Sequence, residues 1–187
     1  MLEVLREAEI SKYQQCYRSA DYRMGGRRRN HVELALRTLD RGSLLDVGCG
    51  RGETLCMAEE LGFSDVHGLE AVDYLCDGQR VVNGLAHAIP FPDKSFDTVT
   101  MFDVIEHLIP QDTDAVCSDL ERVAKKHILL TVHNGSSKHN NVELHINRKD
   151  SYQQWFEYFT QKFSGIVEWM PRHGSISEMF KVTYGSR

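Results

Sequence analysis

The sequence predicts an α/β fold in which a mostly parallel β-sheet is covered by helices on both faces. Short apolar runs alternate with longer segments of helical patterning, and this alternation is typical of parallel sheets. The chain also ends in two apolar runs, 166–170 and 176–182, joined by a segment short enough for a hairpin. The last strand is therefore expected to be antiparallel.

The expected elements follow one another with clear start and stop signals. Helices are expected at residues 1–22, 31–39, 53–61, 112–126 and 149–163. Strands are expected at residues 44–47, 66–69, 80–82, 96–102, 127–132, 166–170 and 176–182. Paired glycines, Gly25 and Gly26, separate the first two helices, and Gly62 is a C-cap signal after the third. Lys125 and Lys126 suit the C-terminus of the fourth helix because cations are favourable there.

Composition excludes several classes of protein. The 187 residues fit one domain with a small appendage, and a formal net charge of −5 excludes a generally basic surface for nucleic acid. The five cysteines are widely spaced and form no CxxC pair, which argues against a zinc site of that type or a disulfide framework. Reduced thiols, no signal-peptide pattern and no membrane-spanning stretch lead us to expect a cytoplasmic protein.

A glycine-rich stretch, DVGCGRG at residues 46–52, lies between an expected strand and an expected helix. Such a turn needs no ligand by itself, but here its N–H groups gather at a helix N-terminus, and Glu70 ends the next strand. A carboxylate in that position can accept both hydroxyls of a ribose. Glu53 stands where the dinucleotide pattern GxGxxG has its last glycine, and would repel a pyrophosphate. A ligand with ribose but without phosphates, such as S-adenosylmethionine, fits better than NAD.

Two further motifs carry a family resemblance. IPFPDKSFD at 89–97 is similar to the "LPFPDxSFD" block, and DVIEHL at 103–108 to the "xVLEHL" block, of one methyltransferase branch. With the glycine stretch, these residues resemble the class I S-adenosylmethionine-dependent methyltransferases of type 11 over residues 43–134. The resemblance implies a Rossmann-like seven-stranded sheet with an antiparallel last strand. We expect an N-terminal helical lid at 1–42 and a methyltransferase core at 43–187.

The resemblance also implies the residues that contact S-adenosylmethionine. The expected cofactor-binding residues are Asp46, Gly48, Cys49, Gly50, Gly52, Glu70, Ala71, Leu85, Ala86 and Asp103. Asp46 and the glycine loop would face the methionine part, Glu70 would hold the ribose, and Ala71 and Val72 would flank the adenine. Leu85 stands where relatives often carry an acid that accepts the adenine amino group, so adenine binding would rest on backbone and apolar contacts, or on His87.

The residues after the fourth expected strand are candidates for chemistry. His107 is the expected base, because its unperturbed pKa lies near working pH, although a role in orienting the start of a helix stays open. Asp103, Glu106 and His107 are also possible ligands of a divalent ion, with helix-capping acids as the alternative to a metal.

The acceptor of the methyl group is not identified by the sequence. A long polar loop at 133–145 is the expected acceptor site, with a solvated loop of no binding role as the open alternative. A small molecule methylated at oxygen or nitrogen is the favoured acceptor. Alternatives are a nucleic acid or protein acceptor, or a non-catalytic module that binds S-adenosylmethionine. Nucleic acid is less expected, because no NPPY-like block follows the fourth strand. The oligomeric state stays open.

Overall fold

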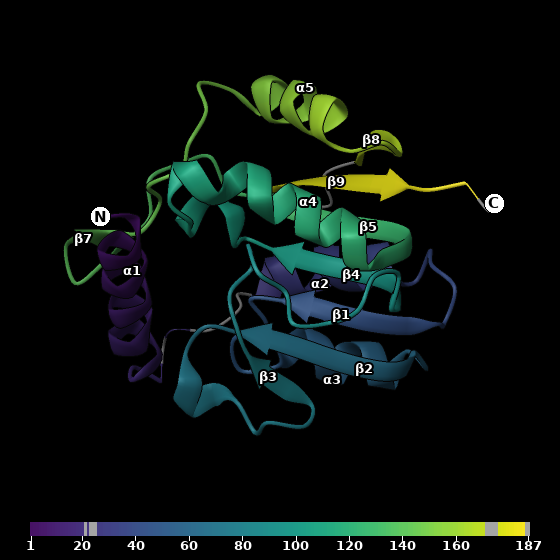
Figure 1. Ribbon diagram of the computed structural model, residues 1–187, viewed down its shortest axis with the longest axis horizontal. Coiled ribbons are helices and arrows are strands. Elements are labelled where there is room, and N and C mark those ends of the chain that lie inside the picture. Colours follow the sequence, from purple (N-terminus) through teal and green to yellow (C-terminus); the bar gives the residue numbers. More distant parts are fainter. Residues whose placement is uncertain (21, 23–25, 171–175, 186–187) are drawn as a thin grey trace.

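The computed structural model describes residues 1–20, 22, 26–170 and 176–185 (Figure 1). The helices are α1 (Leu2–Tyr17), α2 (Gly26–Leu36), α3 (Glu53–Glu60), α4 (Thr113–Val123) and α5 (Tyr152–Lys162), with short 3-10 turns η1 (Asp73–Leu75), η2 (Ile105–His107) and η3 (Pro110–Asp112). The strands are β1 (Ser43–Val47), β2 (Ser64–Glu70), β3 (Val81–Asn83), β4 (Phe96–Phe102), β5 (Ala124–Val132), β6 (Lys138–His139), β7 (Val142–Glu143), β8 (Ile166–Met170) and β9 (Glu178–Thr183).

The central sheet has seven strands in the order β3-β2-β1-β4-β5-β9-β8. The first five strands in this order pair in parallel, and β9 is antiparallel to both β5 and β8. The last strand is therefore inserted antiparallel within the sheet, and the predicted fold class is confirmed. The expected hairpin connection at 171–175 lies outside the described residues.

Two apolar clusters, one on each face, hold the sheet between helices. Alternate residues of a strand point to opposite faces, so Leu45 packs into one cluster and its neighbour Leu44 into the other. The Leu45 cluster includes Leu120 of α4 and Trp155 of α5, whereas the Leu44 cluster includes Leu36 of α2 and residues of α3. Figure 1 shows α4 and α5 on the side of the sheet opposite to α2 and α3.

Several predicted boundaries are wrong by a few residues. The fourth helix was expected to reach residue 126, but α4 ends at Val123 and β5 begins at Ala124. Ala124 is fully buried and pairs with Phe96 of β4. The stabilisation from strand pairing and burial therefore outweighs that from cations at a helix C-terminus. The second helix begins at Gly26 rather than at residue 31, and it packs against the sheet through buried side chains such as Val32. The short hairpin of β6 and β7 was not predicted.

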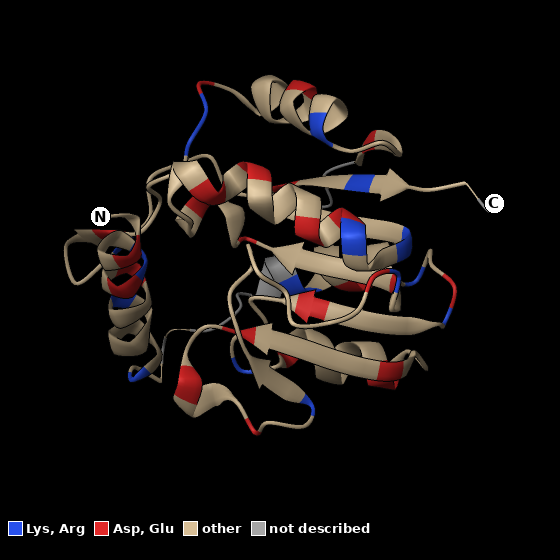
Figure 2. Cartoon of the chain, viewed as in Figure 1, with Lys and Arg blue, Asp and Glu red and all other residues tan. Residues whose placement is uncertain are grey.

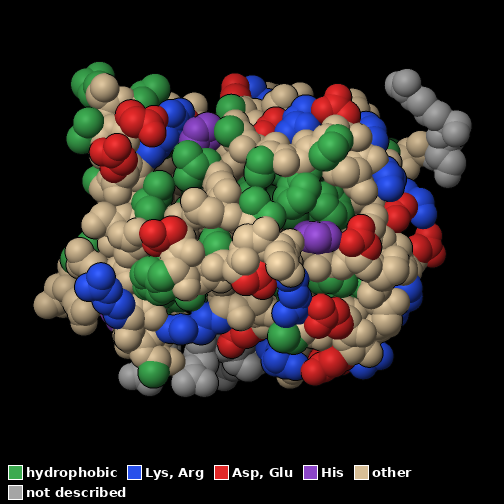
Figure 3. Space-filling model, turned by 60° about the horizontal axis from the view of Figure 1, so that its bottom comes forward, with side chains coloured by type: hydrophobic (Ala, Val, Ile, Leu, Met, Phe, Trp, Pro, Cys, Tyr) green, Lys and Arg blue, Asp and Glu red, His purple; other side chains and the backbone are tan. Residues whose placement is uncertain are grey.

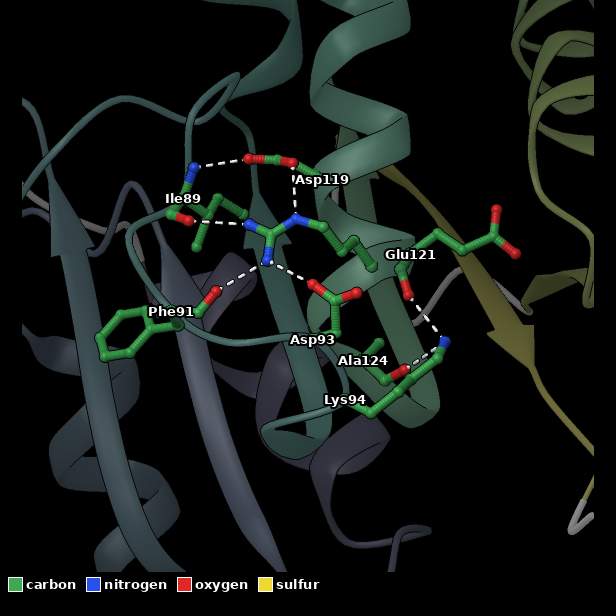
Figure 4. A network of polar contacts seen from close by, with 8 residues as sticks. Ile89, Phe91, Asp93, Lys94, Asp119, Glu121 and Ala124 are labelled. Atoms are coloured by element: carbon green, nitrogen blue, oxygen red, sulfur yellow. Dashed lines mark hydrogen bonds and ion pairs between the residues drawn. The ribbon is translucent and has the colours of Figure 1, made fainter.

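The segment after β3 is fixed to α4 by one arginine (Figure 4). Arg122 donates to the carbonyls of Ile89 and Phe91 at 2.8 and 2.7 Å and to the carboxylates of Asp119 and Asp93 at 2.9 and 3.0 Å. Asp119 in turn accepts the Ile89 N–H at 2.5 Å. Residues 89–93 of the IPFPDKSFD motif are thus fixed to α4, and they hold the residues that precede them against the end of the sheet.

Charged side chains of both signs are distributed over the described part of the chain (Figure 2). The face presented in Figure 3 has Lys and Arg interspersed with Asp and Glu around a central group of hydrophobic side chains. Within the described residues, no helix has the length and apolar character needed to cross a membrane.

Candidate active site

A cavity of about 660 Å³ opens at the carboxyl ends of the parallel strands, within the usual size range of sites for small molecules and cofactors. Sheets of this type bind ligands at that edge. The cavity wall comes from the loop after β1, the ends of β2 and β4, the segment after β3, α1, and the 133–145 loop. Figure 1 shows α1 standing across the ends of the strands, and the side chains of this helix that line the cavity are those of Arg6, Glu9, Ile10, Tyr13 and Tyr17.

The loop between β1 and α3 turns too sharply to carry side chains at its glycines. Gly48 and Gly50 have φ angles of +74° and +55°, in the left-handed region that favours glycine. A Cβ on Gly48 would lie 2.5 Å from Val104 Cγ2, and one on Gly50 would collide with the Tyr17 hydroxyl. Gly52 lies just outside the cavity wall, at the N-cap of α3. The loop can therefore approach a ligand with bare backbone at Gly48 and Gly50.

Glu70, the last residue of β2, is almost fully buried where β2 meets the glycine loop. Its Oε2 accepts a hydrogen bond from the Gly50 N–H at 2.8 Å, and its Oε1 accepts one from the Val72 N–H at 2.9 Å. Burial raises the pKa of Glu70, and the hydrogen bonds from Val72 and Gly50 oppose that rise. Each carboxylate oxygen keeps a further lone pair, so Glu70 can brace the loop and also accept hydroxyls from a ligand.

Asp46 and Asp103, near the ends of two central strands, are held by hydroxyl side chains. Thr100 Oγ1 donates to Asp46 Oδ1 at 2.6 Å. Thr131 Oγ1 donates to Asp103 Oδ1 at 2.6 Å, and Ser177 Oγ donates to Asp103 Oδ2 at 3.0 Å. Asp103 also has a φ of +52°, and backbone strain of this kind concentrates at functional sites. Both carboxylates therefore face the cavity in fixed orientations.

The residues predicted to bind the cofactor converge on this cavity from separate segments. Those that line it are Asp46, Gly48, Cys49, Gly50, Glu70, Ala71, Leu85, Ala86 and Asp103. Leu85 and Ala86 are half-buried and belong to the segment anchored by Arg122. His87 also lines the cavity, and its Nδ1 lies 3.5 Å from a carboxylate oxygen of Asp112. The individual roles of these residues stay predictions.

A cluster of histidines lies in the cavity wall that is built by η2 and the 133–145 loop. His107 ends η2, directly after β4, and its ring centroid lies 4.7 Å from that of His145. The ring of His133 lies 5.0 Å from His145 on another side. Ligand atoms of Glu106, His107 and His145 all lie within 4.8 Å of one another, and Glu106 is fully buried. The sequence grouped Asp103 with Glu106 and His107 as possible metal ligands. Among the described residues, however, the cluster is completed by His145 and does not include Asp103.

The 133–145 loop is ordered by one carboxylate. Glu143 accepts hydrogen bonds from Ser136 Oγ at 2.5 Å and from the N–H groups of Ser137 and His145 at 2.9 and 3.1 Å. These bonds lower the pKa of Glu143 to about 2. Burial lowers the pKa of His145, and the neighbouring His133 lowers it further, while the hydrogen bond with the Gly135 carbonyl opposes this shift. His145 was assigned to this polar loop by the sequence, but its contact with His107 was not predicted.

Helix α1 is attached to both ends of the cavity. The Tyr13 hydroxyl lies 2.6 Å from Nδ1 of His107 at one end, and the Tyr17 ring lies over the glycine loop at the other. Arg6 forms a two-pronged ion pair with Asp112, with Nε to Oδ2 at 2.9 Å and Nη2 to Oδ1 at 2.7 Å. The expected lid role of residues 1–42 stays a prediction, with α1 over the cavity and α2 packed on the sheet.

Comparisons with known proteins agree with this architecture. Residues 45–131 match the pattern of a family described as "Methyltransferase domain". A protein of Encephalitozoon cuniculi (strain GB-M1), named as a methyltransferase, is 32% identical over 119 residues, which are 59% of this chain and 57% of that relative. The chain thus spans little more than half the length of this curated relative.

Solved structures share the fold at low sequence identity. The 1,6-didemethyltoxoflavin-N1-methyltransferase of Burkholderia thailandensis, solved with its acceptor and S-adenosylhomocysteine, superimposes with a TM-score of 0.77 at 14% identity, covering 100% of this chain and 91% of that one. A protein of Pyrococcus horikoshii OT3 gives a TM-score of 0.64 at 19% identity, covering 89% of this chain and 92% of that one.

The matched pattern covers the segment that contains the glycine loop, Glu70 and the strand leading to His107. The seven-stranded sheet with its inserted antiparallel strand is the fold of solved methyltransferases. Residues 45–131 therefore match a methyltransferase domain, and the chain has the fold of solved methyltransferases, which together support a class I enzyme whose cofactor is S-adenosylmethionine.

Proposed function

We propose that this chain transfers the methyl group of S-adenosylmethionine to an oxygen or nitrogen of a small acceptor molecule. The observation that carries the proposal is one continuous cavity, which has Glu70 and the glycine loop at one end and His107, His133 and His145 at the other. A cofactor held by the first group would present its methyl group to an acceptor held by the second. Holding both reactants in one hollow supplies the proximity that a displacement reaction needs.

The reaction places few demands on the protein. A lone pair of the acceptor oxygen or nitrogen attacks the methyl carbon, and the electron pair of the broken sulfur–carbon bond returns to sulfur, which leaves S-adenosylhomocysteine. A hydroxyl acceptor must also lose its proton, and the histidine cluster is the part of the cavity suited to remove it. His107 is the residue we place beside the acceptor.

A small acceptor is favoured by the volume of the cavity and by the net charge of the chain. Helix α1 forms part of the cavity wall and is held by the Arg6–Asp112 pair, and the cavity volume of about 660 Å³ suits a cofactor and a small molecule. The net charge of −5 and the mixed charges on the face that Figure 3 presents do not favour the attraction of a nucleic acid to that face.

The proposal is tested in two steps, binding and transfer. Calorimetry should find that S-adenosylmethionine binds more tightly than NAD, and that Glu70→Gln weakens binding by about 1–3 kcal/mol, the cost of hydrogen bonds to a charged group. His67→Gln, a histidine substitution away from the cavity, is the matched control.

Transfer is then followed with methyl-labelled cofactor against hydroxyl- and amine-bearing metabolites, RNA and peptides. We expect label in a small molecule, and a loss of about 10²–10⁴ in turnover for His107→Ala. Tighter binding of NAD would overturn the cofactor assignment for this site. Label found only in RNA or peptide would overturn the small acceptor, and cofactor binding without any transfer would indicate a binding module.

A further inference from the structure

Three side chains from two segments that are distant in the sequence lie close together in the cavity wall. Each of them carries an atom of a type that transition metals bind. Glu106 and His107 belong to η2, and His145 comes from the loop after β7. Their ligand atoms lie within 4.8 Å of one another, which a small shift of the rings would bring into one coordination sphere. A carboxylate with two imidazoles is a donor set that binds zinc in several catalytic sites, and imidazole also suits other late divalent metals.

Both imidazoles are oriented by backbone carbonyls in the manner of metal ligands. Nδ1 of His145 lies 2.5 Å from the Gly135 carbonyl oxygen, and Nδ1 of His107 lies 3.1 Å from the Leu144 carbonyl oxygen. A carbonyl can only accept, so we assign the proton to each Nδ1, and the Nε2 of the neutral ring then presents a lone pair; at His107 this assignment makes the Tyr13 hydroxyl an acceptor from Nδ1 and not a donor to it. Metal-binding histidines are characteristically fixed in this way by a hydrogen bond from the other ring nitrogen.

Tyr13 fits the same protonation pattern at His107. Its hydroxyl lies 3.3 Å from the Leu144 carbonyl and 2.6 Å from Nδ1 of His107. The arrangement that satisfies all three groups has the tyrosine O–H donating to the carbonyl and the protonated Nδ1 donating to the carbonyl and to the tyrosine oxygen.

Glu106 is held as firmly as the two histidines. Its backbone carbonyl accepts the N–H groups of Ile146 and Asn147, both at 3.0 Å, and its Oε1 accepts the His133 N–H at 2.8 Å. These bonds tie η2 directly to the segment that carries His145. The ligand set is therefore built from two mutually fixed segments rather than from independent surface side chains.

We propose that Glu106, His107 and His145 bind one divalent ion of the zinc, cobalt(II) or manganese(II) class in the acceptor part of the cavity. Three protein ligands leave a coordination position open toward the cavity. Resting on the proposed function, an acceptor hydroxyl takes that position, and the ion lowers its pKa so that its proton passes to water. The oxygen then attacks the methyl carbon as described above, and His107 acts through the metal instead of taking the proton itself.

Metal binding can be measured without any acceptor. The protein is stripped with EDTA and titrated with cobalt(II) while its visible absorption is recorded, and with zinc by calorimetry. We expect one ion per chain. Loss of an orienting partner alone costs roughly 10–100-fold in metal affinity, so the ligand variants Glu106→Gln and His145→Gln should weaken binding by about 100-fold or more. His67→Gln should bind the metal as the unchanged protein does, because His67 lies away from the cavity.

The outcomes separate the metal site from methyl transfer. Absence of a one-to-one complex, or equal affinity in His145→Gln and His67→Gln, overturns the site. Binding of S-adenosylmethionine by each variant shows that its cavity is folded, and if Glu106→Gln fails this check, His145→Gln decides. Full methyl transfer in EDTA overturns the role of the ion while the methyltransferase proposal stands. A metal-loaded protein that binds no S-adenosylmethionine overturns the proposed function and leaves the metal site standing.

Discussion

Replacement of Gly50 by alanine tests whether the glycine loop and helix α1 are built against each other. Alanine at a φ of +55° costs about 1–2 kcal/mol for left-handed backbone. The new Cβ also collides with the Tyr17 hydroxyl and would lie 3.1 Å from Tyr17 Cζ, so the ring must leave its place. Forcing a side chain off its rotamer adds about 1 kcal/mol. We therefore expect Gly50→Ala to destabilise the protein by about 2–3 kcal/mol in urea unfolding.

Gly62→Ala is the matched control for this change. Gly62 has a φ of +87°, and apart from its chain neighbours no described residue has an atom within 4 Å of the position its Cβ would take. It therefore reports the backbone cost alone, about 1–2 kcal/mol. Cofactor affinity should be unchanged in Gly62→Ala. In Gly50→Ala it should fall about 10-fold or more, equivalent to about 1.4 kcal/mol, because the displaced Tyr17 disturbs the cavity wall.

A second variant identifies the collision as the cause. Adding Tyr17→Ala to Gly50→Ala removes the obstructing ring, so the two changes together should cost less than the sum of their separate effects. If Gly50→Ala binds S-adenosylmethionine as tightly as Gly62→Ala does, or if the two changes are additive, the packing argument fails.

Three further predictions concern the cavity wall and the residues that hold it in place. Arg122→Met should destabilise the protein by about 1–3 kcal/mol, because it removes charged hydrogen bonds to two carbonyls and to Asp119, and a loss below about 0.5 kcal/mol in urea unfolding would contradict the anchoring role. The pKa of Glu143, about 2 in the folded protein and below its ordinary value of 4.5, means that it stabilises the fold above pH 4.5 and that this contribution is lost as pH falls toward 2. A carboxyl titration followed by NMR checks that value, and Ser136→Ala should raise it. Leu85→Asp should keep or tighten cofactor binding, because Leu85 is half-buried in the cavity wall, and weaker binding with a large fall in Tm would refute this expectation.

The sequence predicted the fold well where its signals are local. Buried parallel strands are apolar along most of their length, and residues 96–102 coincide with β4 for that reason. The prediction failed at Lys125 and Lys126, where charge favoured a helix end. Strand β5 begins at Ala124 because pairing with Phe96 of β4 decides the boundary, and no local pattern records that pairing.

The two ends of the cavity also differed in how far the sequence predicted them, and the difference again depends on whether the signal is local. The glycine loop and Glu70 form a compact pattern at the ends of neighbouring strands, so their convergence could be expected before the structure was known. The approach of His145 to His107 depends instead on the path of a polar loop tied by Glu106 and Glu143. Long-range hydrogen bonds of this type leave no periodicity in the sequence, so the sequence suggested Asp103 beside Glu106 and His107 and did not indicate the proximity of His145.

Helix α1 contacts both ends of the cavity, and this links the release of two products that many enzymes release independently. Under the proposed function, spent cofactor near Tyr17 and methylated product near Tyr13 and His107 would both lie against this helix. If α1 has the expected lid role, loosening of the Arg6–Asp112 pair and of the tyrosine contacts would let both products leave in one motion.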